Sequence, residues 1–268
     1  MRVRLTAFRE KDLPQPMHDA PAARRDPATR LDEVLSRIAI AARAVGRDPA
    51  EIQLVAVSKT RSADDIRALA AAGATAFGEN YLQEALTKQS QLKDLPICWH
   101  FIGAIQTNKT RSIAENFDWV HSADRLRVLE RLAVQRPPQK GPLNVCLQVN
   151  LDAEAGKAGL VPDAVAAVLA PALELSNLAI RGLMAIPAPR LEDATRREPF
   201  RRLADLARAL EAEVAGARLD VLSMGMSDDL EAAVAEGATH VRVGSALFGP
   251  RAAGNADAER QDVRDGEV

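Results

Sequence analysis

The stretch Ile52-Gln-Leu-Val-Ala-Val-Ser-Lys-Thr60 predicts a buried strand that ends at a lysine. Residues 52–57 are mostly apolar and β-branched, which is typical of a strand covered on both faces. Lys59 follows the end of that strand, and strand ends are where α/β proteins build their sites. An arbitrary lysine at a strand end is usually solvated, so the role of Lys59 depends on the residues that the rest of the chain brings near it.

Seven further strand-like stretches follow this one, and helix-like stretches separate them. We expect these strands at residues 75–77, 97–102, 119–121, 143–149, 180–184, 221–223 and 239–243. Eight strands that alternate with helices in a chain of 268 residues predict an α/β fold, a (β/α)8 TIM-type barrel. An open doubly wound sheet is the alternative, but no Gly-x-Gly-x-x-Gly follows the first strand to support its dinucleotide-binding form.

The chain divides into a barrel and two tails. Residues 1–28 are rich in proline and mixed charge and contain no hydrophobic core of a signal peptide, so we expect a disordered N-terminal tail. An extra helix, from Ala28 to Val45, precedes the first strand, because its apolar residues recur at helical spacing. We place the barrel at residues 29–252 and a flexible, polar C-terminal tail at 253–268.

Composition excludes several classes of function. The net charge is −2, so no overall field attracts nucleic acid or an acidic membrane, and no apolar run is long enough for a membrane span. Cys98 and Cys146 are too far apart for a zinc pattern, and both lie in apolar stretches as small buried residues of a reducing compartment would. We therefore expect a cytoplasmic protein without a metal site.

Residues that follow the strands share one face of a barrel, and here they are polar and rich in glycine. The last two strands end in Ser223-Met-Gly-Met-Ser227 and Gly244-Ser-Ala-Leu-Phe248. Glycines let backbone N–H groups approach an anion, and serines add hydroxyl donors. Each Gly-Ser pair alone is more often a turn or a cap, but two pairs on adjacent strand ends, facing Lys59, indicate a phosphate site.

Other polar residues leave two interpretations open. Arg242 lies inside the last strand, where it either forms a structural ion pair or reaches a ligand near Lys59. Glu79 follows the second strand and is more typical of a solvated or capping carboxylate than of an acid or base. His100, His121 and His240 lie on separate strands at no metal-ligand spacing, which favours satisfied strand-end histidines.

A lysine, a phosphate site and an arginine together describe a pyridoxal 5′-phosphate (PLP) pocket. The chain resembles the pyridoxal phosphate homeostasis proteins, single-domain relatives of the alanine racemase N-terminal barrel, from about residue 29 to 251. The stretches that carry this resemblance are Leu-Val-Ala-Val-Ser-Lys59, Phe-Gly-Glu-Asn80-Tyr, Trp-His-Phe-Ile-Gly103, Gln-Thr-Asn-Lys109, Leu-Gln-Val-Asn150, Arg-Gly-Leu-Met184, Leu-Ser-Met-Gly-Met-Ser227 and Val-Arg242-Val-Gly244. The chain departs from the family at Ala104, where a histidine or proline is usual.

The resemblance implies a role for each residue of the site. It implies that Lys59 holds PLP as an internal Schiff base, that Asn80 lies near the ring and that Arg242 faces the pyridine nitrogen. It also implies that the phosphate is lined by Ser223, Met224, Gly225, Gly244 and Ser245. In the family such a protein serves intracellular PLP (vitamin B6) homeostasis by buffering or delivering the cofactor, which makes apo PLP-dependent enzymes its candidate partners.

Catalysis is a separate question from binding. A cation at the pyridine nitrogen disfavours protonation of the ring and weakens it as an electron sink. A racemase also needs an acid/base on each face of the substrate, and Tyr81, the single tyrosine, begins a helix on the wrong side. We therefore expect a PLP-binding monomer with no catalytic residue. The alternatives are a PLP-dependent amino-acid racemase and a barrel enzyme that binds a phosphosugar through Lys59.

Overall fold

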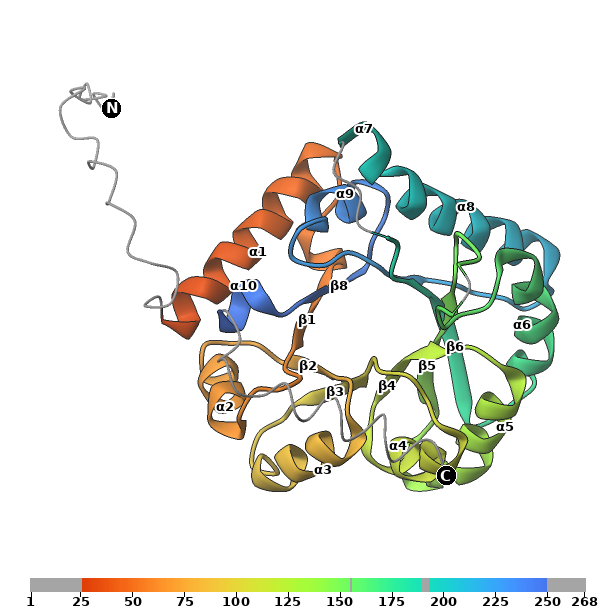
Figure 1. The fold of residues 1–268 in the computed structure, drawn as a ribbon, viewed down its shortest axis with the longest axis horizontal. Coiled ribbons are helices and arrows are strands. Elements are labelled where there is room, and N and C mark those ends of the chain that lie inside the picture. Colours follow the sequence, from red (N-terminus) through yellow and green to blue (C-terminus); the bar gives the residue numbers. More distant parts are fainter. Residues whose placement is uncertain (1–25, 155, 189–192, 250–268) are drawn as a thin grey trace, which may run out of the picture.

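Eight parallel strands close into a barrel in the computed structural model, which describes residues 26–154, 156–188 and 193–249 (Figure 1). The strands follow one another around the barrel in chain order, and β8 pairs with β1. Their bounds are β1 (Gln53–Val57), β2 (Ala76–Glu79), β3 (Cys98–Phe101), β4 (Trp119–Ala123), β5 (Leu143–Val149), β6 (Leu178–Ala185), β7 (Val221–Ser223) and β8 (His240–Val243). The predicted barrel and its eight strands are thus confirmed, with small differences at strand ends.

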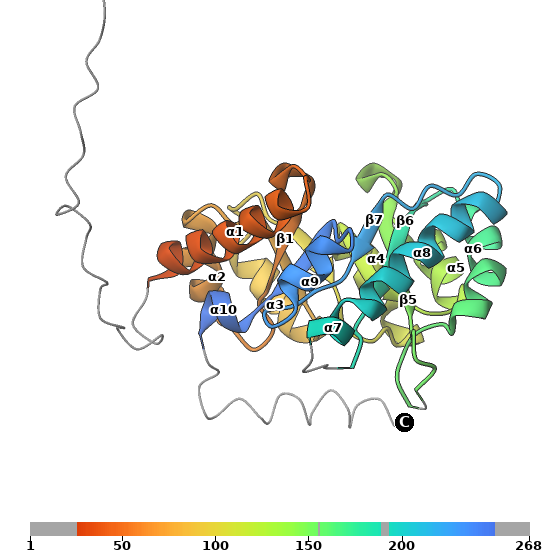
Figure 2. The same cartoon turned by 90° about the horizontal axis from the view of Figure 1, so that it is seen from above.

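Helices surround the barrel, as Figure 1 shows along its axis and Figure 2 from the side. The α-helices are α1 (Pro27–Ala44), α2 (Ala63–Ala71), α3 (Leu82–Gln91), α4 (Thr110–Asn116), α5 (Leu126–Gln135), α6 (Val165–Leu173), α7 (Asp193–Arg196), α8 (Glu198–Glu213), α9 (Leu230–Ala235) and α10 (Ser245–Phe248). Short 3₁₀ turns are η2 (Pro49–Glu51), η3 (Thr107–Lys109), η4 (Pro138–Lys140) and η5 (Pro162–Ala164). None of the helices in the described part of the chain has both the length and the apolar character of a membrane span.

Local capping explains where the first two helices begin. Asp26 accepts a hydrogen bond from the Thr29 amide, so α1 begins at Pro27, and the extra N-terminal helix reaches into the last residues of the predicted tail. Ser62 and Asp65 form the reciprocal capping box that starts α2. Most of the two predicted tails lies outside the described residues.

Successive side chains along a strand alternate between the apolar layer under the helices and the interior of the barrel. On β8, Val241 and Val243 belong to the large apolar cluster between the strands and the helices. His240 and Arg242 alternate with them and point into the barrel, where Arg242 contacts Ser223 of β7. The apolar layer outside the strands holds the fold together, whereas the interior of the barrel carries buried polar groups that need hydrogen-bond partners.

Gly182 on β6 is a point where the barrel tolerates no side chain. A Cβ atom added there would lie 1.7 Å from the carbonyl oxygen of Val221, its partner residue on β7. Since both atoms belong to paired strands, neither can move without disturbing the ladder. The glycine therefore allows β6 and β7 to approach each other.

Gly182→Ala should destabilise the protein by about 1–3 kcal/mol, because the added methyl group overpacks a rigid strand pair. Urea unfolding of the variant measures this. Ala179→Ser, a half-buried change of similar size on the same strand, is the control and should stay close to the wild type. Equal unfolding midpoints for the two variants would contradict the close approach of β6 and β7.

Candidate functional site

A cavity of about 340 Å³ opens at the carboxyl end of the barrel, and we refer to it as the pocket. Its volume falls within the range of roughly 300–1,000 Å³ that small-molecule sites occupy. The residues that line it are Val57, Lys59, Arg61, Asn80, Ile102, Ile186, Met226, Ser227, Asp228, Arg242, Gly244, Ser245 and Gly249. They come from β8 and from the ends of β1, β2, β3, β6, β7 and β8, as expected for a barrel of this class.

The pocket brings together five of the eight residues that the sequence singled out. Lys59, Asn80, Arg242, Gly244 and Ser245 all line it. The remaining three, at positions 223–225, are not among its lining residues in the described structure, so their contact with a phosphate stays a prediction.

The end of β7 lines the pocket two or three residues later than the sequence suggested. Gly225 has a φ of +91°, and a Cβ atom there would lie 2.5 Å from Cβ of Ala233. This turn, which only glycine makes without strain, carries the chain away from the barrel axis and presents Met226 and Ser227 to the pocket. Ser227 accepts a hydrogen bond from the Ser245 hydroxyl at 3.2 Å. The repeated serine in Ser223-Met-Gly-Met-Ser227 was the signal that could have found it.

Lys59 occupies the second position of a tight turn that ends β1. The Arg61 amide donates to the Ser58 carbonyl at 3.0 Å and closes the turn. Thr60, in the third position, has a φ of +62°, whereas Lys59 is not among the residues with a positive φ, and together with the Ser58–Arg61 hydrogen bond this is the pattern of a type II turn. A β-branched residue in this left-handed region costs roughly 1–2 kcal/mol, so neighbouring groups must hold the turn.

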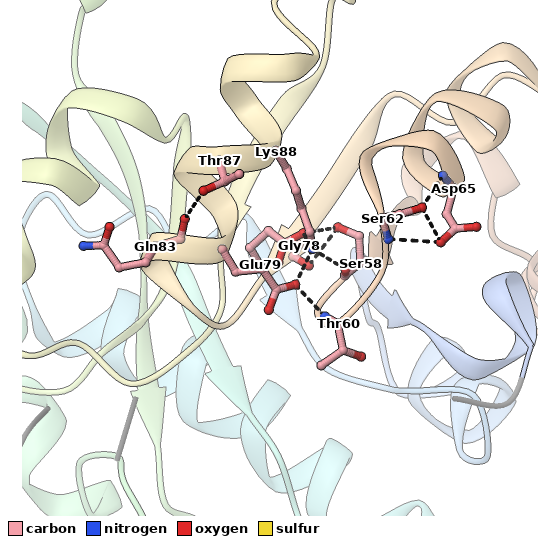
Figure 3. Close-up of polar contacts among 10 residues, drawn as sticks. Ser58, Thr60, Ser62, Asp65, Gly78, Glu79, Gln83, Thr87 and Lys88 are labelled. Atoms are coloured by element: carbon pink, nitrogen blue, oxygen red, sulfur yellow. Dashed lines mark hydrogen bonds and ion pairs between the residues drawn. The ribbon is translucent and has the colours of Figure 1, made fainter. Parts of the chain in front are cut away.

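An ion cluster formed by Glu79, Glu84 and Lys88 contacts this turn, and Figure 3 labels Glu79 and Lys88 beside it. Glu79 is fully buried and accepts hydrogen bonds from Lys88 Nζ at 2.8 Å and Ser58 Oγ at 2.6 Å. The predicted solvated or capping role of Glu79 is therefore wrong, because β2 extends through this residue and turns its side chain inward. Burial raises the pKa of Glu79, and the opposing effect of Lys88 only partly offsets it.

Arg242 is a buried cation held by neutral acceptors. Its Nη1 donates to Ser223 Oγ at 2.7 Å and its Nη2 donates to the Ala185 carbonyl at 2.9 Å. No carboxylate of the described residues lies within ion-pair distance of it, so the interpretation as a structural ion pair is wrong. Burial lowers the pKa of Arg242 to about 10, which leaves it charged at neutral pH. The guanidinium thus supplies the pocket with a positive charge and directed N–H groups.

A chain of buried hydrogen bonds extends from Arg242 through the barrel interior. Because Ser223 Oγ accepts from Arg242, its own proton is directed to His121 Nδ1, at 2.7 Å. His121 Nε2 then donates to His100 Nδ1 at 2.8 Å, and His100 Nε2 faces Cys98 Sγ at 3.4 Å. This assignment of tautomers gives every proton along the chain an acceptor. The His240 ring lies 6.1 Å from that of His100 and 5.8 Å from that of His121, between ring centroids, so the three strand histidines meet inside the barrel, which their positions in the sequence did not reveal.

These histidines are neutral in the folded protein. Burial lowers the pKa of His100 to about 3 and that of His240 to about 4. Burial, together with its charged and titratable neighbours, also lowers the pKa of His121 well below its ordinary value. A neutral His121 can accept the Ser223 proton, which keeps the Ser223 oxygen turned toward Arg242.

Asn80 contributes a buried acceptor whose hydrogen bonding is incomplete. It lines the pocket, and its buried Oδ1 has no hydrogen-bond partner. Its backbone is closely covered, because a Cβ atom at Gly103 would lie 2.0 Å from the Asn80 carbonyl oxygen. A buried acceptor without a donor is costly, so this geometry suits a ligand that brings a donor to the pocket.

Two remaining sequence features lie away from the pocket. Tyr81 is the N-cap residue of α3 and does not line the pocket, as the sequence predicted. Cys146 is buried and Cys98 is partly exposed, and burial raises the pKa of both thiols to about 12, so neither is a reactive thiolate. The described residues contain no group of three or more histidines, cysteines or carboxylates that could hold a metal ion.

Comparison with known proteins identifies relatives of this barrel. The profile of the alanine racemase N-terminal domain matches residues 30–252. The pyridoxal phosphate homeostasis protein of Pseudomonas aeruginosa is 56% identical over 224 residues, which are 84% of this chain and 95% of that protein. The homologous protein of Escherichia coli is 45% identical over 229 residues, 84% of this chain and 97% of its own.

Solved structures agree with these sequence relatives. PipY of Synechococcus elongatus, solved with PLP bound, is 41% identical with a TM-score of 0.74, and the match covers 83% of this chain and all of that one. Alanine racemase of Corynebacterium glutamicum is 21% identical with a TM-score of 0.56, over 84% of this chain and 63% of the racemase. The second likeness extends to the fold alone.

The neutral histidines make stability depend on pH. Their folded pKa values lie below the unfolded value, so their contribution is complete above about pH 6.5 and is lost as the pH falls toward 4. Between these pH values, each histidine lowers the free energy of unfolding by about 1.4 kcal/mol for every pH unit of acidification. Urea unfolding at about pH 7 and about pH 5 should therefore give a much lower stability at the acidic pH.

His240→Gln provides the control for this pH effect. Removing one of the three titrating groups should make the loss of stability with acidification shallower by roughly one third. Wild-type stability that is unchanged between the two pH values would contradict neutral, buried histidines.

Proposed function

Since the chain belongs to the pyridoxal phosphate homeostasis family of alanine racemase-like barrels, we propose that it binds PLP and serves intracellular PLP homeostasis. It would hold the cofactor on Lys59 and buffer or deliver it. The observation that carries the proposal is the pocket itself, where an amine, an acceptor without a partner and a buried cation face one cavity. The PLP-bound state of PipY, a relative at 41% identity, supports it.

The pocket offers a distinct partner for each part of the cofactor. Lys59 supplies the amine that would bond to the aldehyde carbon, and PLP contributes that electrophilic carbon when bound. Gly244 and Ser245 begin α10 beside Ser227, so backbone and hydroxyl donors converge where a phosphate would bind. Arg242 would donate to the unprotonated pyridine nitrogen, because its guanidinium carries N–H donors and no hydrogen-bond acceptor. With these assignments the cofactor would lie between β1 and β8.

The same geometry favours a carrier over a racemase. Arg242 keeps its charge and forms no ion pair with a carboxylate of the described residues, so it would oppose protonation of the ring. Among the described residues that line the pocket there is no histidine or tyrosine, and Asp228, which is exposed to solvent, is the one carboxylate. A racemase needs a second acid/base within hydrogen-bond reach of the substrate. Asp228 is therefore the candidate that a racemase hypothesis would have to use.

The wider setting of this function is also part of the proposal. We infer a cytoplasmic monomer that exchanges PLP with apo PLP-dependent enzymes. A single barrel with its pocket open to solvent at the strand ends supports direct release of the cofactor. Size-exclusion chromatography with light scattering tests the monomer, and mixing the PLP-loaded protein with an apo PLP-dependent enzyme tests delivery.

Lys59→Ala should abolish the visible absorption band that appears when the purified wild-type protein is titrated with PLP. Affinity should fall about tenfold to a hundredfold but not vanish, because Arg242, Ser227 and Ser245 remain. Equilibrium dialysis measures it, and Lys93→Ala, an exposed lysine after α3, is the control. A band that survives in Lys59→Ala would contradict the anchor, and complete loss of binding with an intact fold would contradict the separate phosphate site.

When L-alanine is incubated with the PLP-loaded protein, the optical rotation of the alanine should not change. The reason is the lack of a buried second acid/base in the pocket lining. Racemisation by the wild type that is lost in both Lys59→Ala and Asp228→Asn would contradict the carrier hypothesis. It would identify the protein as a racemase that uses both residues.

A further inference from the structure

The turn that carries Lys59 adopts a conformation that its own sequence disfavours. Type I and type II turns differ by a flip of their central peptide, which here joins Lys59 to Thr60. The type II form requires a positive φ in the third position and normally uses glycine or asparagine there. Thr60 adopts it with a φ of +62°. Something outside the turn must therefore select this orientation of the central peptide.

Glu84 makes the contact that selects it. The Thr60 N–H, which belongs to the central peptide, donates to Glu84 Oε1 at 2.6 Å. In the flipped, type I form the Lys59 carbonyl oxygen would face the Glu84 carboxylate in place of this N–H, and two acceptors would repel each other. The hydrogen bond to a charged acceptor is also of the stronger kind.

Lys88 fixes Glu84 and the start of the turn together. Its ammonium group forms an ion pair with Glu84, four residues earlier on α3, and with Glu79 on β2 at 2.8 Å. It also donates to the Ser58 carbonyl at 2.7 Å, the same oxygen that accepts from the Arg61 amide. Figure 3 shows Lys88 and Glu79 beside Ser58 and Thr60 of the turn. The three ammonium protons thus have three acceptors, two carboxylates and the first carbonyl of the turn.

Glu84 acts on the pocket without touching it. It does not line the pocket, and its side chain is 22% exposed, on the side of α3 that faces the turn. We propose that Glu84 is a positioning residue for Lys59: by holding the Thr60 amide it selects the type II turn, which presents the lysine amine to PLP in one conformation. The inference rests on the proposed function, because it concerns capture of PLP by Lys59.

Glu84→Ala should slow covalent capture of PLP by about fivefold to thirtyfold, the factor that matches the cost of a left-handed threonine. Stopped-flow absorbance measures the rate. Thr60→Gly in the Glu84→Ala background should restore it, because glycine adopts the type II turn unaided. Gln83→Ala, an exposed change on the same helix, is the control with an expected wild-type rate. If Glu84 acted only through its charge near Lys88, Thr60→Gly would not restore the capture rate.

A second measurement does not depend on PLP. Hydrogen exchange of the Thr60 amide in the ligand-free protein should be at least tenfold faster in Glu84→Ala than in the wild type. Wild-type capture rates in Glu84→Ala, or a loss that Thr60→Gly does not restore, would overturn the inference. A wild-type protein that binds no PLP would overturn the proposed function instead, and the two failures are thus distinguishable.

Discussion

Pairing between β1 and β8 is the constraint on which the site depends. Residues from Gln53 to Ala56 align with His240 to Val243, so the first and last strands of the barrel are neighbours. That register brings the turn after β1 beside the end of β8. Lys59 and Arg242 share one cavity only because the barrel closes between them. Gly182 supports the closure on the other side, since it allows β6 to approach β7.

Two groups of polar residues flank the pocket, and they stabilise their charges in different ways. The chain from Arg242 through Ser223 to His121 and His100 contains one cation and otherwise neutral groups. It holds a charge in the interior by directed hydrogen bonds, and no described carboxylate neutralises it. In the cluster of Glu79, Glu84 and Lys88, by contrast, the charges form ion pairs, and Glu84 also accepts a hydrogen bond from Thr60 in the strained turn after β1. Both systems preorganise a group that faces the pocket, the guanidinium in one case and the lysine in the other.

The strands could be predicted from the sequence because buried parallel strands are apolar runs rich in β-branched residues. Most of the site could be predicted because sites in barrels form at the ends of the strands. Lys59, Asn80 and Gly244 follow from this rule alone. What it missed depends on distances between elements. Glu84 and Lys88 look like an ordinary helical pair until β2 places Glu79 against them, and Ser227 replaces Ser223 in the pocket because Gly225 turns the chain.

Reduction of the PLP-loaded protein with borohydride tests the central claim, that the barrel closure turns Lys59 into a covalent anchor. Peptide mass spectrometry after proteolysis then locates the reduced cofactor. We predict a single adduct on the peptide that contains Lys59, with none on Lys88, whose ammonium group donates to three acceptors. An adduct spread over surface lysines such as Lys93, or no adduct on a protein that binds PLP, would contradict it.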